Sequence, residues 1–469
     1  MPETALLWLR NDLRVADNPA LAAAVETGLP VTALYIHETD ATLRRRGAAS
    51  RWWLHHSLTS LAKDLAKLGI RLEVVEGKAE TSVLAAVKTT GATSVAWNRR
   101  YAPAQCEIDA AIKSRLKSDG VQAESHAGNV LIEPWEIATG AGKPYSVYTP
   151  FWNALKDRTI PTPLSAPQGR RPVAADERID AAYKTPSWAA KLEPHWQIGE
   201  VAAREKLAAF LADAILDYPE GRDFPAQQAT SKLSPHLAFG EISPRQVWHA
   251  ATMHAHHSPR SAEAVQKFLK ELVWRDFNYH QLCHREDISR VPMQSKFAGL
   301  DWRQADAAFH DWQRGQTGIP IVDAGMREMW ATGFMQNRVR MLTASLLAKN
   351  LLVDWRKGET WFWDCLVDAD IANNPGNWQW VAGSGLDASP FFRIFNPVTQ
   401  GEKFDADGEY VRRWVPELAA LPEELIQNPA VASAAVLKKS GVELGVTYPR
   451  PIVDLKISRE RALEAFKAL

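Results

Sequence analysis

Short apolar runs alternate with amphipathic stretches through residues 1–130. The runs ALLWLR, VTALYIH, IRLEVVE and TSVAWNR each have the length and composition of a buried strand. Between them the periodicity predicts helices at Pro19–Glu26, Ala48–Leu68 and Cys106–Leu116. Strands that alternate with helices pair in parallel, because each helix carries the chain back to the same end of the sheet. The sequence therefore predicts an N-terminal α/β domain with a doubly wound parallel sheet.

The turn after the first run lacks the glycines of a dinucleotide site. After ALLWLR the chain continues NDLRVADNP rather than G-x-G-x-x-G. Those glycines let a pyrophosphate approach the N-terminus of the following helix. We therefore expect no ordinary NAD site in this domain.

A change of composition marks the end of this region. Residues 161–194 are rich in Pro, Ala and charge, which is typical of an extended connector. Beyond Gly199 the apolar period becomes helical, with long segments at Val201–Leu216, Ser261–His284, Ile321–Thr332 and Met335–Asn350. We therefore predict an α/β domain in residues 1–130, a connector in 131–198 and a large all-α C-terminal domain in 199–469.

The composition limits the class of protein. With 469 residues, 46% hydrophobic and 23% charged, the chain can form two or more globular domains. Lys and Arg together number 55, as do Asp and Glu, so only a local basic groove would favour nucleic acid. No signal peptide or membrane span is expected, since the apolar run MLTASLLAKNLLVDW is interrupted by Lys349. These features predict a cytoplasmic protein.

Cysteine and histidine usage argues against metal sites. Cys106, Cys283 and Cys365 are too few for an iron–sulfur cluster held by four thiolates or for a disulfide framework. The histidines of MHAHHSP lie in a segment that is more often a solvated turn than a metal site. We expect no metal.

Tryptophan is unusually frequent, with 19 Trp against 9 Tyr. Such an excess serves either packing or electron transfer. The segment Asp368–Pro397 combines Trp378 and Trp380 with the turn residues Asn-Asn-Pro-Gly, which predicts a loop-rich region. Two indoles in a loop indicate a pocket for a flat aromatic ligand rather than a core layer.

Two predicted helices carry polar side chains at helical spacing. Glu271, Trp274, Arg275 and Asn278 follow the pattern i, i+3, i+4, i+7, so they share one face. A surface stripe of ion pairs under an indole explains this face equally well. On the second helix Asn337 and Met341 lie four residues apart, and a methionine at that spacing usually belongs to the core.

Two further features favour a cofactor that contains phosphate. Thr230–Gly240 offers hydroxyl and backbone N–H groups ahead of a helix begun by Pro235, which suits a pyrophosphate, although an ordinary N-cap has the same appearance. Arg340 is expected to pair with Asp368 and Asp370 in a buried ion pair. Such a pair is costly to desolvate and is therefore typical of a functional site.

Several long motifs, in a shared order from Leu6 to about Leu463, resemble the DNA photolyase/cryptochrome family. They are WLRNDLR, YPEGRDFP, TSKLSPHLAFGEISPRQVW, ELVWRDF, TGIPIVDAGMREMWATGFMQNRVRM, LLVDWRKGE, DADIANNPGNWQW, RIFNPVTQGEKFD and YPRPIVD. The segment RGAASRWWLHHSL is more similar to plant cryptochromes than to the best-known bacterial photolyase, which indicates the bacterial class III branch.

The resemblance implies a U-shaped FAD in the helical domain. Its FAD-binding positions are matched by Tyr218, Thr230, Ser231, Lys232, Leu233, Ser234, Arg275, Arg340, Asp368, Asp370 and Asn374. The positions that meet a flipped-out pyrimidine dimer are matched by Glu271, Trp274, Asn337, Met341 and Trp380. The three tryptophans that carry electrons to FAD are matched by Trp302, Trp355 and Trp378.

Ultraviolet-damaged DNA is the partner that the resemblance implies. A basic rim that holds its phosphates is expected to include Arg222, Arg338, Arg393, Gln400 and Lys403. The resemblance implies neither a protein partner nor a membrane, and we expect a monomer in the bacterial cytoplasm.

The family's N-terminal domain often binds a light-harvesting antenna. Trp52, Tyr101 and Gln105 are the candidate residues here. Gln105 stands where folate-binding relatives carry a carboxylate, which removes the usual anchor for the pterin. We expect 5,10-methenyltetrahydrofolate, with 8-hydroxydeazaflavin as the second choice.

Four features indicate repair of cyclobutane pyrimidine dimers rather than light sensing. Asn374 matches the residue that faces flavin N5, where photolyases have Asn and plant cryptochromes have Asp. Trp380 stands where the cryptochrome branches tend to have Tyr, and Asn337 and Met341 stand where the (6-4) branch uses histidines. The sequence ends fifteen residues after YPRPIVD, which we read as the absence of a long signalling tail. A blue-light receptor without repair activity and a plain nucleotide-binding α/β enzyme remain the alternatives.

Overall fold

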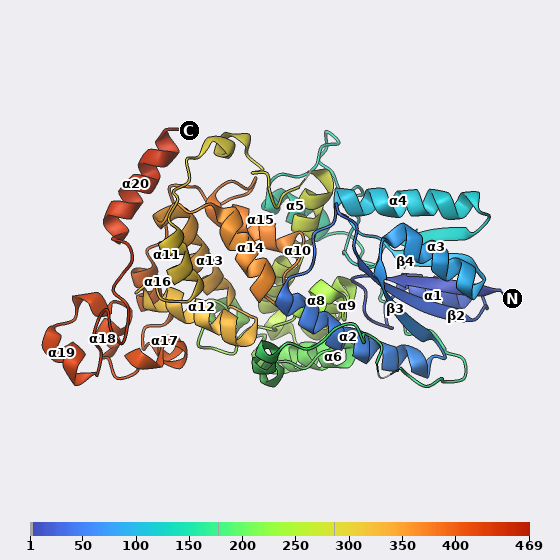
Figure 1. The fold of residues 1–469 in the computed structure, drawn as a ribbon, viewed down its shortest axis with the longest axis horizontal. Helices are drawn as coiled ribbons and strands as arrows, with labels where there is room; N and C mark the ends of the chain where they lie inside the picture. The colour runs from blue at the N-terminus through green and yellow to red at the C-terminus, as the bar shows by residue number, and fades with distance from the viewer. Residues whose placement is uncertain (1–2, 177, 286) are drawn as a thin grey trace. The chain divides into compact units, whose positions relative to one another are not determined.

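A computed structural model describes residues 3–176, 178–285 and 287–469 (Figure 1). The chain forms two compact units. The first comprises Met1–Leu216 and Ser231–Glu286, and the second comprises Asp217–Thr230 and Asp287–Leu469. Compact units join segments that are distant in the sequence, whereas the expected domains are contiguous stretches. The borders 1–130, 131–198 and 199–469 therefore stay a prediction.

The first unit contains a five-stranded parallel sheet with the order β3-β2-β1-β4-β5. Its strands are β1 (Thr4–Leu9), β2 (Val31–Glu38), β3 (Arg71–Gly77), β4 (Ala92–Asn98) and β5 (Gln122–His126). β1 lies at the centre, where Leu7 pairs with Ala33 on one side and Ala96 on the other. The doubly wound parallel sheet is confirmed. β5 was not predicted, because QAESH is a short, polar edge strand without an apolar run.

Helices cover this sheet and extend the first unit. Those of the α/β region are α1 (Pro19–Glu26), α2 (Ala48–Lys67), α3 (Ala79–Thr90) and α4 (Pro103–Ser118). The side chain of Asn18 accepts from the Leu21 N–H at the start of α1, and Pro19 follows it at N1. The remaining ones are α5 (Tyr148–Leu155), α6 (Glu200–Ala209), α8 (Ser234–Phe239), α9 (Pro244–His257) and α10 (Ala262–His284), with a π-helical turn at Phe210–Ala214.

The second unit is helical. Its main elements are α7 (Tyr218–Gly221), α11 (Asp306–Gln313), α12 (Pro320–Thr332), α13 (Asn337–Ser345), the π-helical turn η6 (Leu346–Asn350), α14 (Trp355–Cys365), α15 (Asn373–Ala382), α16 (Pro397–Phe404), α17 (Glu409–Trp414), α18 (Glu423–Ile426), α19 (Ala434–Lys439) and α20 (Leu455–Lys467). The predicted helices Ile321–Thr332 and Met335–Asn350 are confirmed within a few residues.

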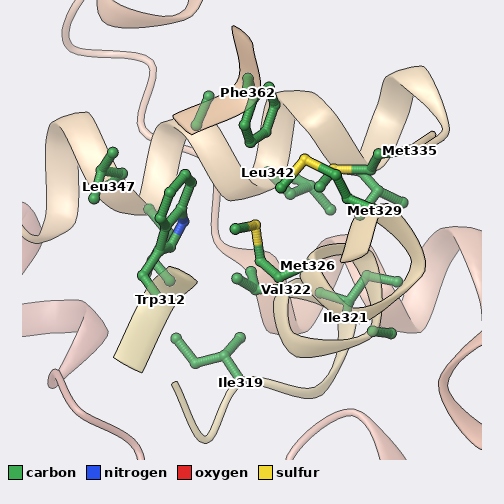
Figure 2. Close-up of a cluster of buried hydrophobic side chains, with 14 of the residues drawn as sticks. Trp312, Ile319, Ile321, Val322, Met326, Met329, Met335, Leu342, Leu347 and Phe362 are labelled. Carbon is green, nitrogen blue, oxygen red and sulfur yellow. The ribbon is translucent and has the colours of Figure 1, made fainter. Parts of the chain in front are cut away.

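A large apolar cluster holds these helices together. Figure 2 shows Trp312 of α11, Met326 of α12 and Phe362 of α14 directed into the space between the helices. All three side chains are buried. The indole N–H of Trp312 donates to the Thr343 carbonyl over 3.0 Å, so the one polar atom of this ring is satisfied. The core thus fixes the mutual positions of the helices that carry the candidate site residues of this unit.

In the part of the chain that the structure describes, no helix combines the length and the apolar character needed to cross a membrane.

Candidate functional site

The segment Asp368–Pro397 is not loop-rich throughout, because α15 occupies Asn373–Ala382. The loop prediction is wrong for these ten residues. Oδ1 of Asp370 accepts from the backbone N–H groups of Ala372 and Asn373, which satisfies donors that the first helical turn leaves unpaired. Pro375 lies in that first turn, where its missing N–H costs nothing. The turn-like Asn-Asn-Pro-Gly letters therefore start a helix.

α15 places Asn374 against a buried carboxylate. Nδ2 of Asn374 donates to Oε1 of Glu359 on α14 over 2.8 Å and to the Glu359 carbonyl over 3.1 Å. Glu359 is 1% exposed. With its N–H groups engaged, the Asn374 side chain can offer its carbonyl oxygen, an acceptor, to a ligand. Sequence reasoning missed Glu359, since a single acid within a helix carries no signal of this contact.

The predicted ion pair is confirmed for Arg340 and Asp368. Nη2 of Arg340 lies 2.9 Å from Oδ2 of Asp368, and the Asp368 side chain is 3% exposed. Nε of Arg340 also donates to the Met335 carbonyl over 2.6 Å, which fixes the plane of the guanidinium. Asp370 instead accepts the hydrogen bonds at the start of α15 that are described above. The pair is half-buried, and its desolvation cost makes it weak evidence for stability.

Two of the three predicted electron-carrying tryptophans are core residues. Trp378 on α15 and Trp355 at the start of α14 are buried in the large apolar cluster, whereas Trp302 is partly buried at its margin. The Trp378 ring packs edge-on against Phe362, with centroids 5.0 Å apart. The interpretation of Trp378 as a pocket wall rather than part of a core layer is therefore wrong. Loop chemistry suggested a pocket, but helix α15 turns the indole inward.

Trp380, Asn337 and Met341 lie at the edge of the same cluster. Trp380 and Met341 are partly buried and pack against it, and Asn337 is exposed. Nδ2 of Asn337 lies 4.0 Å from the sulfur of Met341, so both side chains occupy one face of α13, as the spacing predicts. Three of the five proposed dimer-contacting residues are thus accessible or half-accessible in the second unit.

Two of the predicted basic residues of the second unit, Arg338 and Lys403, lie beside one aromatic ring, and Arg393 lies elsewhere. Arg338 forms an ion pair with Asp223 over 2.7 Å, and its guanidinium lies 4.5 Å from the centre of the Phe404 ring. The ammonium of Lys403 lies 5.1 Å from the centre of the same ring. Arg393 is exposed on a different segment, between α15 and α16.

The remaining basic-rim and FAD positions of this unit are Tyr218, Arg222, Thr230 and Gln400. Arg222 follows α7, and its carbonyl accepts from the Gln336 side chain. Its guanidinium lies 5.4 Å from the ring centre of Tyr218, which is buried. Gln400 is half-buried on α16, and Thr230 is half-buried at the end of its segment.

α10 of the first unit carries the predicted polar face. The Trp274 ring stacks on Tyr148 of α5, with centroids 3.8 Å apart and planes 8° apart. Burial, and next the charge of Glu271, raise the pKa of Tyr148. Sequence reasoning missed Tyr148, which lies in the region assigned to a connector. The aromatic run YSVYTPFW was the available signal.

Arg275 holds a neighbouring segment of the first unit. Its Nη1 donates to the Asn129 carbonyl over 2.6 Å. The adjacent carboxylate of Asp276 accepts from the backbone N–H groups of Leu131 and Ile132, and burial raises its pKa to about 6. This end of α10 is therefore fastened to residues 129–132.

The segment ahead of α8 has an unusual backbone. Lys232 adopts φ of 49°, a left-handed conformation that non-glycine residues rarely take. The Leu233 N–H lies 3.4 Å from the Ser231 hydroxyl, and α8 then begins at Ser234 with Pro235 behind it. Leu233 is buried and Ser234 is exposed, so a hydroxyl faces outward at the predicted phosphate-binding segment.

The three candidate antenna residues have separate surroundings. Trp52 is buried on α2, where its ring contacts Trp53 and His56. Tyr101 is also buried, and its hydroxyl donates to Glu133 over 2.9 Å. Gln105 is half-buried on α4. Their antenna role stays a prediction.

Among the residues that the structure describes, no group of three or more His, Cys, Asp and Glu side chains could hold a metal ion.

Comparison with known proteins places this geometry in a family. A family profile described as DNA photolyase matches residues 5–168, and one described as the FAD-binding domain of DNA photolyase matches residues 268–468. A deoxyribodipyrimidine photo-lyase from Agrobacterium fabrum is 49% identical over 99% of this chain and 98% of the relative. The chain belongs to the DNA photolyase/cryptochrome family.

Structural similarity points to the same branch. The crystal structure of a bacterial class III photolyase from Agrobacterium tumefaciens has a TM-score of 0.95 and 49% identity, covering 100% of this chain and 98% of that one. Cryptochrome-2 of Arabidopsis thaliana is 36% identical over 99% of this chain and 79% of the relative. The predicted family and its class III resemblance are confirmed, as is the helical FAD-binding domain.

The donors and acceptors of the second unit fit FAD. Arg340 and Asp368 supply a fixed cation and anion, and Asn374 supplies an oriented acceptor. Fully reduced flavin carries a hydrogen on N5, and this N–H group can donate a hydrogen bond to an amide carbonyl.

Asn374→Asp should destabilise the protein in a pH-dependent manner. A second carboxyl would meet Oε1 of Glu359, now 2.8 Å from the amide nitrogen, so the folded pair would retain one proton. The unfolded chain loses both protons near pH 4, so the folded state binds more protons above that pH and loses stability as pH rises. We expect urea unfolding to show a loss of about 2 kcal/mol at pH 8 and much less at pH 5.

Asn377→Asp is the matched control, because Asn377 is exposed on the same helix. Its stability should change by less than about 0.5 kcal/mol at either pH. An equal loss at pH 5 and pH 8 for Asn374→Asp would contradict the Glu359 contact.

Proposed function

We propose that this protein is a light-dependent DNA repair enzyme that splits cyclobutane pyrimidine dimers, a deoxyribodipyrimidine photo-lyase. The observation that carries the proposal is the Asn374 amide, held by the buried Glu359 in a chain that is 49% identical to such an enzyme. A neutral amide favours the anionic, fully reduced flavin, whereas a carboxylic acid could protonate it. The chain has the residue that suits repair.

FAD is the cofactor that this function requires. When bound and fully reduced, it supplies the light-driven electron that splits the dimer. Arg340 with Asp368 would hold and orient it, and Asn374 would accept a hydrogen bond from it. The segment from Thr230 to Ser234 would bind its pyrophosphate, and Tyr218, Arg275 and Asp370 would complete its contacts.

The dimer is the substrate, and five side chains would bind it. Trp274 and Trp380 are large enough to stack on an extruded dimer. Glu271 would hydrogen-bond a carbonyl of the dimer and stabilise the negative charge that it gains, while Asn337 and Met341 would fix its position. Tyr148 supports the Trp274 plane from behind, so this indole is already oriented before DNA binds.

The DNA backbone would be held by Arg222, Arg338, Arg393, Gln400 and Lys403. Arg338 is already paired with Asp223 over 2.7 Å, so phosphate must compete with this carboxylate. Arg393 is exposed and is the stronger candidate for a direct phosphate contact.

Three further properties complete the proposal. A methenyltetrahydrofolate antenna is preferred to 8-hydroxydeazaflavin in the N-terminal domain. The protein acts in the bacterial cytoplasm, and it acts as a monomer.

An absorption spectrum and a repair assay test the function. Purified protein should show the near-ultraviolet and blue bands of a flavin. Under light and with reduced flavin, it should split a defined thymine dimer in an oligonucleotide. Flavin photochemistry without loss of dimers would support the alternative, a blue-light receptor without repair activity. A colourless protein would contradict both.

Glu271→Ala should lower the number of dimers repaired per absorbed photon. We expect a loss of about tenfold, because a single electrostatic donor or acceptor at a site of developing charge commonly contributes this much or more. Light-driven reduction of oxidised flavin should be unchanged, since the three tryptophans remain. Equal repair yield in the variant and the wild type would contradict the role of Glu271.

Trp378→Phe should have the opposite effect. Phenylalanine is much harder to oxidise than tryptophan, so light-driven reduction of oxidised flavin should largely fail. The chemically reduced variant should still repair dimers. Trp414→Phe is the control, because Trp414 packs against the same core and lies outside the proposed row. Normal photoreduction in Trp378→Phe would exclude this indole from electron transfer.

A further inference from the structure

Lys349 is a lysine whose side chain is buried in the second unit. It is 0% exposed and lies in the π-helical turn η6. Burial, and next the charge of Arg393, lower the pKa of Lys349 to about 7. A methionine of similar length would fill the same space without this desolvation cost. Burial of the apolar stem alone therefore does not explain a lysine at this position.

The ammonium of Lys349 contacts the segment between α15 and α16. Nζ donates to the Arg393 carbonyl over 2.9 Å and lies 3.5 Å from the Pro390 carbonyl. It also lies 5.5 Å from the ring centre of Phe391. One buried amino group thus contacts both ends of the turn Pro390–Arg393. The same turn contains an internal bond from the Arg393 N–H to the Pro390 carbonyl, over 2.9 Å.

Phe391 is the buried residue of this turn, and Pro390, Phe392 and Arg393 are exposed. Phe391 is 2% exposed and stacks on Phe466 of α20, with ring centroids 5.0 Å apart. Phe392 is 61% exposed and Arg393 is exposed. A buried phenylalanine and the Lys349 contacts together fix which of the two neighbouring aromatic rings faces outward.

The turn is connected to the residues proposed to bind the dimer. The Ser389 N–H donates to the Trp380 carbonyl over 3.1 Å. Gly383, the C-cap residue of α15, adopts φ of 87°. A Cβ on Gly383 would lie 3.1 Å from Cα of Phe391, so the close approach favours glycine. The exposed Phe392 and Arg393 therefore follow closely on the α15 end that carries Trp380.

We propose that Lys349 is a positioning residue for DNA binding, whose Nζ holds the turn Pro390–Arg393 so that Phe392 and Arg393 meet damaged DNA beside Trp380. This inference rests on the proposed function, because it assigns the turn to the DNA surface. Lys349 itself touches neither DNA nor FAD. Because Lys349 orders the turn in the free protein, less conformational entropy is lost when DNA binds.

Lys349→Met tests the inference, because methionine keeps the length of the stem and removes the donor. Lys357→Met is the control, since Lys357 is a partly exposed lysine of the same unit that pairs with Asp306. Hydrogen exchange at the Arg393 and Ile394 amides of the DNA-free protein should become about tenfold faster in Lys349→Met alone. The dissociation constant for dimer-containing DNA should rise about tenfold.

The repair yield per photon at saturating DNA should be unchanged in Lys349→Met, as should FAD content and flavin photoreduction. A general structural defect would lower all of these together, and that result would overturn the inference. Unchanged amide exchange would also overturn it, as would faster exchange with unchanged affinity. If wild-type protein neither binds nor repairs dimers, the proposed function fails, and the exchange measurement still decides whether Lys349 orders the turn.

Discussion

The contact between Glu359 and Asn374 sets the geometry on which the candidate site of the second unit depends. It joins α14 to α15, and these helices also carry Trp355 and Trp378. The residue before the acid is Gly358, where a Cβ would lie 2.3 Å from the Trp378 ring. The absence of a side chain at Gly358 lets the indole lie against the α14 backbone. One close approach of two helices therefore fixes both an oriented amide and a buried indole.

Buried charge in this unit serves orientation more than stability. Glu359 fixes an amide, Asp368 fixes a guanidinium, and Lys349 fixes two backbone carbonyls. Removing each of these groups from water costs free energy, and its attraction to a partner offsets only part of that desolvation free energy. Light-driven electron transfer requires little covalent chemistry from the protein, so accurate positioning is the main contribution of these side chains.

The fold was largely predictable, whereas α15 was not. The apolar runs identified four of the five strands, because period and composition are local properties. Asn373 to Gly376 has the composition of a turn, yet Asp370 satisfies the first N–H groups and a helix forms. The same turn-like composition predicts that Trp378 lines a pocket, whereas helix α15 buries this indole in the core. The family motifs predict candidate site residues, but they give no signal of the contacts that Tyr148, Glu359 and Lys349 make.

The amino-acid sequence alone determined the family, the parallel sheet and the helical C-terminal part, and it predicts the candidate site residues, since these depend on local pattern and on long ordered motifs. Tertiary structure decided which polar groups are held in one orientation and which neighbouring residues hold them. It buried Glu359 beside Asn374, stacked Tyr148 on Trp274, and brought Lys349 to the carbonyl of Arg393, forty-four residues away. These contacts join distant segments, and no local property of the chain encodes them.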